Sequence, residues 1–286
     1  WIDISKKRAL AHKKYLNKLP FSDLKVFSML ESRIPKKYTI QVSNSSTIRY
    51  MQLFDYNPLC RVYCNRGTSG IDGSTSTAIG ASVKSAFPIL LITGDLSFFY
   101  DSNGLWNSNI KPSFRIIVIN NNGGGIFKIL PGYKNNIIST KFIETRHELS
   151  TKHLARMHGF EYSKARSEIG LKWRLYSFFK KSSKPRILEI NTNSDLSSDL
   201  LKKYFINNKK KSFSNNYYWL LYLSGFILLI FSVFFFSIIY IKFFMNERIL
   251  SIKELPSAVF SNHLFSIGII FAVIFFPSIL FSDKLG

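Results

Sequence analysis

Five short apolar runs recur between residues 38 and 191, and they constrain the fold more than any other feature of the chain. Amphipathic stretches separate the runs, which are 38–42, 60–64, 88–93, 115–120 and 186–191. Apolar strands that alternate with helices are typical of a parallel sheet whose two faces are both covered. We therefore predict an α/β fold with helices at 46–55, 72–85, 98–107, 149–158, 168–181 and 194–205.

The 286 residues have room for one such domain and a further part. We assign the α/β domain to residues 37–206. Residues 1–36 are basic and have helical periodicity up to Pro35, so we interpret them as a lead-in segment or the end of a preceding domain. Residues 207–286 form a third region of different composition.

Two of the predicted strands are followed directly by bare polar groups. Asp95 follows the run "PILLIT" after one glycine, and Asn121 follows "RIIVIN" at the head of "NNGGG". One strand–helix–strand crossover separates them, so both belong at the carboxyl edge of the sheet, where ligands bind in this fold class. A carboxylate, an amide oxygen and the carbonyl of Gly123 suit a hard divalent cation such as Mg²⁺. Each half alone has an ordinary reading, as a helix cap or a flexible turn.

Two further stretches point to anion binding at the same edge. "VSNSSTIRYM" predicts a strand, a turn and a helix, where Ser45 can donate to a diphosphate and Arg49 lies in the first helical turn. Arg66 lies in the stretch "NRGTSGIDGSTSTAIG", and its planar guanidinium group can donate two parallel hydrogen bonds to a carboxylate. The alternatives are a solvated surface for the first stretch and a small-residue packing helix for the second.

The stretches "NRGTSGIDGSTSTAIGAS" and "GDLSFFYDSNGLWN…NNNGGGIF" together closely resemble 2-succinyl-5-enolpyruvyl-6-hydroxy-3-cyclohexene-1-carboxylate synthase, the MenD family of menaquinone biosynthesis. The resemblance is to the C-terminal, thiamine-diphosphate-binding part and covers roughly residues 20–206. The general thiamine-diphosphate motif begins with GDG, and Leu96 replaces the glycine at its third position. This departure matches the family. The resemblance implies a transferase that decarboxylates 2-oxoglutarate and adds the resulting succinyl-semialdehyde unit to isochorismate, with thiamine diphosphate and Mg²⁺ or Mn²⁺ as cofactors.

The resemblance also implies roles for individual residues. Asp95, Asn121 and the carbonyl of Gly123 correspond to the metal ligands. The other cofactor contacts implied are Ser45, Leu96 and Ser97 at the diphosphate, Ile71 beneath the bent cofactor, and Ile126 in the apolar wall. The substrate-binding residues implied are Arg49, Arg66, Phe127 and Leu130.

Family members are much longer than this chain. Their activating glutamate lies in an N-terminal pyrimidine-binding domain, so we expect no catalytic residue of that kind here and no turnover by the chain alone. The partner is expected to be a second copy of the chain or a separate N-terminal domain. Two alternatives stay open: another thiamine-diphosphate decarboligase related to acetolactate synthase, or a non-catalytic membrane-anchored remnant or fusion.

The third region, 207–286, predicts a membrane tail. Residues 217–241 contain no charge and exceed the ~20 residues that cross a bilayer. A second apolar stretch, 264–281, predicts a further span. Lysines cluster before the first span, so the positive-inside bias places the α/β domain in the cytoplasm, anchored to the plasma membrane of a bacterium.

The net charge of +22 raises the question of nucleic-acid binding. The basic residues are scattered, and no arginine-rich or aromatic–basic module accompanies them. We therefore expect no nucleic-acid partner.

Overall fold

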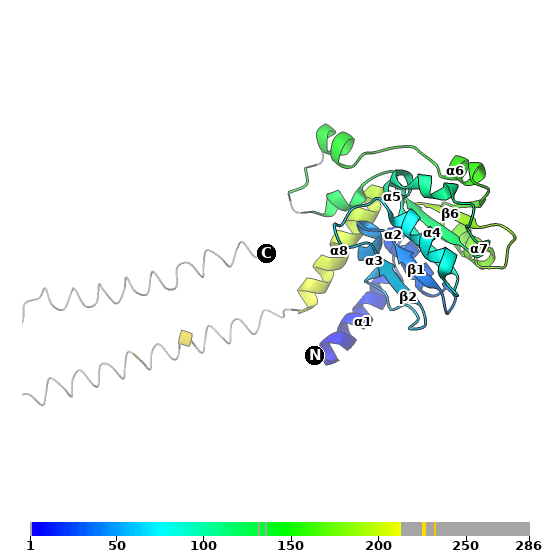
Figure 1. Ribbon diagram of the computed structural model, residues 1–286. Helices are drawn as coiled ribbons and strands as arrows, with labels where there is room; N and C mark the ends of the chain where they lie inside the picture. The colour runs from blue at the N-terminus through cyan, green and yellow to red at the C-terminus, as the bar shows by residue number, and fades with distance from the viewer. Residues whose placement is uncertain (1, 131, 135, 213–224, 227–231, 233–286) are drawn as a thin grey trace, which may run out of the picture. The chain divides into compact units, whose positions relative to one another are not determined.

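The structure is a computed structural model that describes residues 2–130, 132–134, 136–212, 225, 226 and 232. The chain divides into two units, Trp1–Ser214 and Asn215–Gly286. Nearly all described residues lie in the first unit, which contains the predicted domain (Figure 1). The domain boundaries expected from the sequence, near residues 36 and 206, stay a prediction.

The first unit is built on a six-stranded parallel sheet, which confirms the predicted α/β class. The strands follow the spatial order β2-β1-β3-β4-β6-β5. They are β1 (Thr39–Val42), β2 (Arg61–Cys64), β3 (Ile89–Gly94), β4 (Arg115–Asn120), β5 (Glu161–Ala165) and β6 (Arg186–Asn191). The five predicted strands are all present, whereas β5 was not predicted, because its sequence, EYSKA, has no apolar run.

Helices cover both faces of this sheet, as the apolar strands require. Alternate strand residues point to opposite faces, so Leu90 and Ile92 of β3 join one core cluster and Ile89 and Leu91 join the other. The first cluster lies beneath α1 (Ile2–Leu16), α2 (Asp23–Glu31), α3 (Ser46–Met51), α7 (Glu168–Phe178) and α8 (Ser194–Ser212). The second lies beneath α4 (Ser74–Lys84), α5 (Asp95–Tyr100), α6 (Lys152–Met157) and the 3₁₀ turn η1 (Ser102–Trp106).

The lead-in segment shares the core of the α/β domain. Leu24, Val26, Phe27 and Leu30 of α2 are fully buried in the first cluster. Full burial of a large apolar side chain stabilises a fold by about 1.5–3 kcal/mol. Helix α1 contacts α2 and α8, and Figure 1 shows α1 and α8 on the same side of the unit.

The helices match the predicted positions but not always the predicted bounds. The helix predicted at 98–107 begins earlier, at Asp95, and gives way to η1 after Tyr100. The helices predicted at 46–55 and 149–158 are shorter, each spanning six residues. Two turns in the long connection after β4 were not predicted, η2 (Gly125–Ile129) and the single π-turn η3 (Ser139–Ile143).

Within the described part of the chain, every helix is either too short or too polar to cross a membrane. The predicted spans at 217–241 and 264–281 lie outside the described residues, apart from Gly225, Phe226 and Ser232. The membrane tail therefore stays a sequence-based prediction.

Candidate cofactor and metal site

A pocket lies at the carboxyl ends of β1, β3 and β4. The chain runs from β1 to β2 on one side of the sheet and then returns past β1 to β3, so the strand order reverses between β1 and β3. Crevices at such a switch point are the usual ligand sites of open parallel sheets. The pocket is partly open to solvent, and polar and apolar residues from several elements line it.

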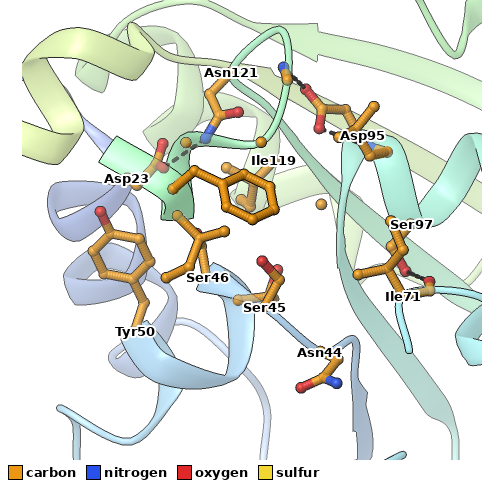
Figure 2. Close-up of a pocket in the computed structure, with 18 of the residues that line it drawn as sticks. Asp23, Asn44, Ser45, Ser46, Tyr50, Ile71, Asp95, Ser97, Ile119 and Asn121 are labelled. Carbon is orange, nitrogen blue, oxygen red and sulfur yellow. Dashed lines mark hydrogen bonds between the residues drawn. The ribbon is translucent and has the colours of Figure 1, made fainter. Parts of the chain in front are cut away.

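Asp95 lies on one side of this pocket and is almost fully buried. It is the first residue of α5, directly after β3. Its Oδ1 accepts a hydrogen bond from Leu96 N at 2.7 Å, and its Oδ2 accepts one from Gly123 N at 3.0 Å (Figure 2). A carboxylate oxygen has more than one lone-pair direction, so both oxygens retain acceptor capacity for a cation.

Asn121 lies across the pocket, one residue beyond β4, and is also buried. Its Nδ2 donates to Oδ2 of Asp23 at 2.9 Å. Its Oδ1 has no hydrogen-bond partner among the described residues, although water does not reach it. Figure 2 shows this oxygen turned away from Asp23, toward the side of the pocket where Asp95 lies. A buried amide oxygen without a partner is costly, and it is the kind of group that a cation would satisfy.

The glycine run after Asn121 has a conformation that needs glycine. Gly123 has φ +141°, and a Cβ there would lie 2.7 Å from the carbonyl oxygen of Glu144. The carbonyl of Gly123 accepts a bond from Gly125 N at 3.0 Å, while Gly124 N donates to the carbonyl of Glu144 at 2.6 Å. The backbone therefore packs closely against the end of the connection that returns to β5.

An ion network, buried at Lys128 and Glu144 and exposed at Arg146 and Asp195, holds the two ends of this connection together. Lys128 in η2 is paired with the carboxylates of Glu144 and Asp195, and Arg146 lies 2.9 Å from Glu144 and 3.4 Å from Asp195. Burial alone raises the pKa of Glu144, but hydrogen bonds from Tyr133 and Arg146 and the charge of Lys128 outweigh it, so the pKa lies below its ordinary value. The network fixes η2 against α8 and so shapes one wall of the pocket.

The turn after β1 closes the pocket from below. Ser45 has φ 72°, an uncommon conformation for a residue other than glycine, and makes no capping bond to α3. The neighbouring Asn44 donates from Nδ2 to the carbonyl of Gly70 at 3.2 Å and accepts from Arg66 Nη1 at 2.5 Å. These bonds tie the turn to the loop that carries Ile71, whose carbonyl accepts a hydrogen bond from Ser97.

The pocket brings together nine of the twelve site residues that the sequence pointed to. These nine are Ser45, Ile71, Asp95, Leu96, Ser97, Asn121, Gly123, Ile126 and Phe127. The other three, Arg49, Arg66 and Leu130, do not line it and are exposed. Arg66 lies at the rim through its bond to Asn44, whereas Arg49 is on the outer face of α3. The roles assigned to all twelve stay predictions.

Two residues near the site were not singled out in the sequence. Asp23 reaches the pocket from α2, and burial raises its pKa although bonds from Thr192 and Asn121 lower it. His147 lies beside Asp95, with Nε2 3.3 Å from Oδ2. Neither residue has a local sequence signal, because each lies in a segment remote from the strand end that it contacts.

Comparison with known proteins gives one consistent result. No family model matches the chain. The 2-succinyl-5-enolpyruvyl-6-hydroxy-3-cyclohexene-1-carboxylate synthase of Christiangramia forsetii is 50% identical over 203 residues, which are 71% of this chain and 35% of the relative. The synthases of the same name from Flavobacterium johnsoniae and Porphyromonas gingivalis are 49% and 38% identical, over 69% and 72% of this chain and 36% of each relative. The chain thus spans about a third of the length of these curated relatives.

Proposed function

Since about 70% of this chain resembles part of 2-succinyl-5-enolpyruvyl-6-hydroxy-3-cyclohexene-1-carboxylate synthase, we propose that the chain is a cofactor-binding part of such an enzyme. Its pocket would bind thiamine diphosphate with Mg²⁺ or Mn²⁺. The substrates of the whole enzyme would be 2-oxoglutarate and isochorismate, joined in menaquinone biosynthesis after decarboxylation of the first. Thiamine diphosphate, when bound, supplies the carbanion chemistry.

One observation supports the metal site above all others: the buried Oδ1 of Asn121 lacks a hydrogen-bond partner within the described part of the chain. It lies in the same pocket as the carboxylate of Asp95. An anionic and a neutral oxygen ligand together suit Mg²⁺, which prefers oxygen and usually shares its shell with a phosphate. The carbonyl of Gly123 would add a third oxygen from the same loop.

The remaining pocket residues would position the cofactor. Ser45 offers a hydroxyl group to a diphosphate, and Leu96 and Ser97, at the start of α5, line the pocket where the diphosphate would lie. Ile71, Ile126 and Phe127 give the pocket an apolar wall. Arg66, held at the rim by Asn44, would meet the carboxylate of a substrate that enters from solvent.

Titration calorimetry of the full chain with thiamine diphosphate tests the proposal, with and without Mg²⁺. We expect metal-dependent binding in the wild type that is lost in Asp95→Ala. Asp199→Ala is the matched control, because Asp199 is exposed on α8 and does not line the pocket. Equal binding by Asp95→Ala, or binding that does not need the metal, would contradict the proposed site.

The chain is proposed to associate with a second copy of itself or with a separate pyrimidine-binding domain. Only the separate domain would supply the activating glutamate, so we propose that turnover requires it. The requirement for a partner is tested by measuring the release of carbon dioxide from 2-oxoglutarate in the presence of isochorismate. We expect none from a preparation of the purified chain alone. Turnover by the chain alone would refute the need for a partner.

We also propose, from sequence alone, that residues 207–286 attach the α/β domain to a bacterial plasma membrane. The uncharged stretch 217–241 is long enough to span a bilayer. Tryptic peptides that cover residues 200–220, recovered from the membrane fraction of cells that express the natural gene, would support this attachment. Their recovery only from the soluble fraction would contradict it.

A further inference from the structure

Asp23 is a buried carboxylate that the proposed cofactor contacts do not use. It is the first residue of α2, preceded by Ser22 as the helix cap, and its side chain is 2% exposed. A carboxylate at a helix N-terminus is favoured by the helix dipole, which offsets part of the cost of burying its charge. Asp23 nevertheless lines the pocket rather than the interior of the core.

Both carboxylate oxygens of Asp23 accept hydrogen bonds from the carboxyl edge of the sheet. Oδ2 accepts from Asn121 Nδ2 at 2.9 Å, and Oδ1 accepts from Thr192 Oγ1 at 2.5 Å. Its backbone N–H donates to Ser197 Oγ at 3.0 Å. Asp23 therefore joins α2 to the ends of β4 and β6 and to the start of α8.

An asparagine amide can turn over, because its oxygen and nitrogen have nearly the same shape. The two orientations differ only in the hydrogen bonds that they make. Both carboxylate oxygens of Asp23 are acceptors in the structure, so the NH₂ group of Asn121 faces Asp23. The oxygen is then left on the pocket side, where Figure 2 shows it and where it has no partner among the described residues.

We infer that Asp23 is a positioning residue that turns the amide of Asn121 so that Oδ1 faces a cation bound beside Asp95. The inference rests on the proposed function, because it assigns a purpose to the orientation of one proposed ligand. The hydrogen bond from the NH₂ group to Asp23 also polarises the amide and increases the negative charge on its oxygen. Groups of this kind behind a ligand typically change metal affinity by about 10–100-fold.

Asp23→Asn is the sharpest variant, because it keeps the size and shape of the side chain. An asparagine at position 23 can present either its oxygen or its NH₂ group, so it no longer dictates which way Asn121 turns. Thr192→Val is the matched control. It removes the bond to Oδ1 of Asp23 but leaves the bond between Oδ2 and Asn121.

The first experiment measures binding of Mn²⁺ to the full chain by electron paramagnetic resonance, with thiamine diphosphate present. We expect Asp23→Asn to weaken binding of Mn²⁺ by about 10–100-fold and Thr192→Val to leave it nearly unchanged, even where Thr192→Val lowers Tm. Equal affinity of Asp23→Asn and wild type, with unchanged circular dichroism, would overturn the inference. Absence of binding by the wild type would instead refute the proposed function.

A double variant separates positioning from a merely structural role. In Asp23→Asn with Asn121→Asp, the hydrogen bond is restored with its polarity reversed, and residue 121 presents an oxygen whichever way it turns. We expect the double variant to regain most of the Mn²⁺ affinity lost in Asp23→Asn, so that the two changes are not additive. Failure to regain it would assign Asp23 to the packing of α2 alone.

The orientation of the Asn121 amide can also be tested in the absence of metal. In protein labelled with ¹⁵N at asparagine, the side-chain NH₂ signal of Asn121 should exchange slowly with solvent in wild type and Thr192→Val. It should exchange at least tenfold faster in Asp23→Asn. Rapid exchange in the wild type would show that Asp23 does not hold the amide, whatever the outcome of the metal titration.

Discussion

His147 and Asp95 face each other at the edge of the pocket, with Nε2 of the imidazole 3.3 Å from Oδ2 of the carboxylate. The ring nitrogen Nδ1 accepts a bond from Leu149 N at 3.1 Å, so Nε2 is the nitrogen that carries a proton in the tautomer the structure favours. The contact is not aligned as a hydrogen bond, since Nε2 has no such partner among the described residues. It is an electrostatic contact between the imidazole ring and the carboxylate.

This relationship predicts a role for His147 in metal binding. We expect His147→Phe to weaken Mn²⁺ binding in the presence of thiamine diphosphate by about tenfold, because Asp95 loses a neighbour that holds it in place. The exposed His153, in α6, provides the matched control, and His153→Phe should bind Mn²⁺ as the wild type does. If both variants bind alike, His147 does not position the carboxylate.

Gly123→Ala should destabilise the protein through local strain. At φ +141°, an alanine is in an unfavourable conformation, and its Cβ would lie 2.7 Å from the carbonyl of Glu144. We expect the free energy of unfolding in urea to fall by about 3 kcal/mol. Gly159→Ala is the control, since Gly159 has φ +76° but no atom within 4 Å of the added Cβ. That variant should lose only about 1–2 kcal/mol, and equal losses would argue against the clash.

Arg115 should be essential for stability rather than for function. It is the buried first residue of β4 and donates to four backbone carbonyls, those of Pro112, Phe114, Phe178 and Lys180. Arg115→Met would remove all four of these bonds, although Arg186 still donates to the carbonyls of Phe114, Phe178 and Lys180. Because the lost bonds come from a buried charged group, we expect the free energy of unfolding to fall by about 3 kcal/mol.

The free energy of unfolding of Arg115→Met is measured in urea and compared with that of a control variant. The control is Arg174→Met, because Arg174 is exposed on α7. This variant should change the free energy of unfolding by no more than about 0.5 kcal/mol. A loss as large in Arg174→Met as in Arg115→Met would mean that the four carbonyl bonds do not account for the effect.

The network around Glu144 should make stability depend on acid pH. The pKa of Glu144 in the folded protein lies below the ordinary value of 4.5, because donors from Tyr133 and Arg146 and the charge of Lys128 outweigh burial. A depressed pKa contributes stability that is fully present above pH 4.5 and is lost as the pH falls through the folded value. The difference in unfolding free energy between wild type and Glu144→Gln should therefore be constant near neutral pH and shrink below pH 4.5. A difference that grows on acidification would contradict this sign.

The carboxyl edge of the sheet was largely predictable because its signals are local. The strands at 88–93 and 115–120 each contain four consecutive apolar residues, ILLI and IIVI, so each had to be buried on both faces. The polar residues that end them, Asp95 and Asn121, then had to meet at one edge, since parallel strands end together. By contrast, β5 lies at an edge of the sheet and is only partly buried. Its sequence therefore has no continuous apolar run from which a strand could be predicted.

The sequence by itself therefore determined the sheet, its carboxyl edge and the two oxygen ligands proposed there. Only the tertiary structure decided which residues contact those ligands and hold them in place. Asp23 is 98 positions from Asn121, and His147 comes from the long connection after β4. Apolar periodicity within a strand or helix is repeated along the sequence and can be read there. A single hydrogen bond between remote segments is fixed only by how the helices pack on the sheet, and it leaves no pattern in either segment.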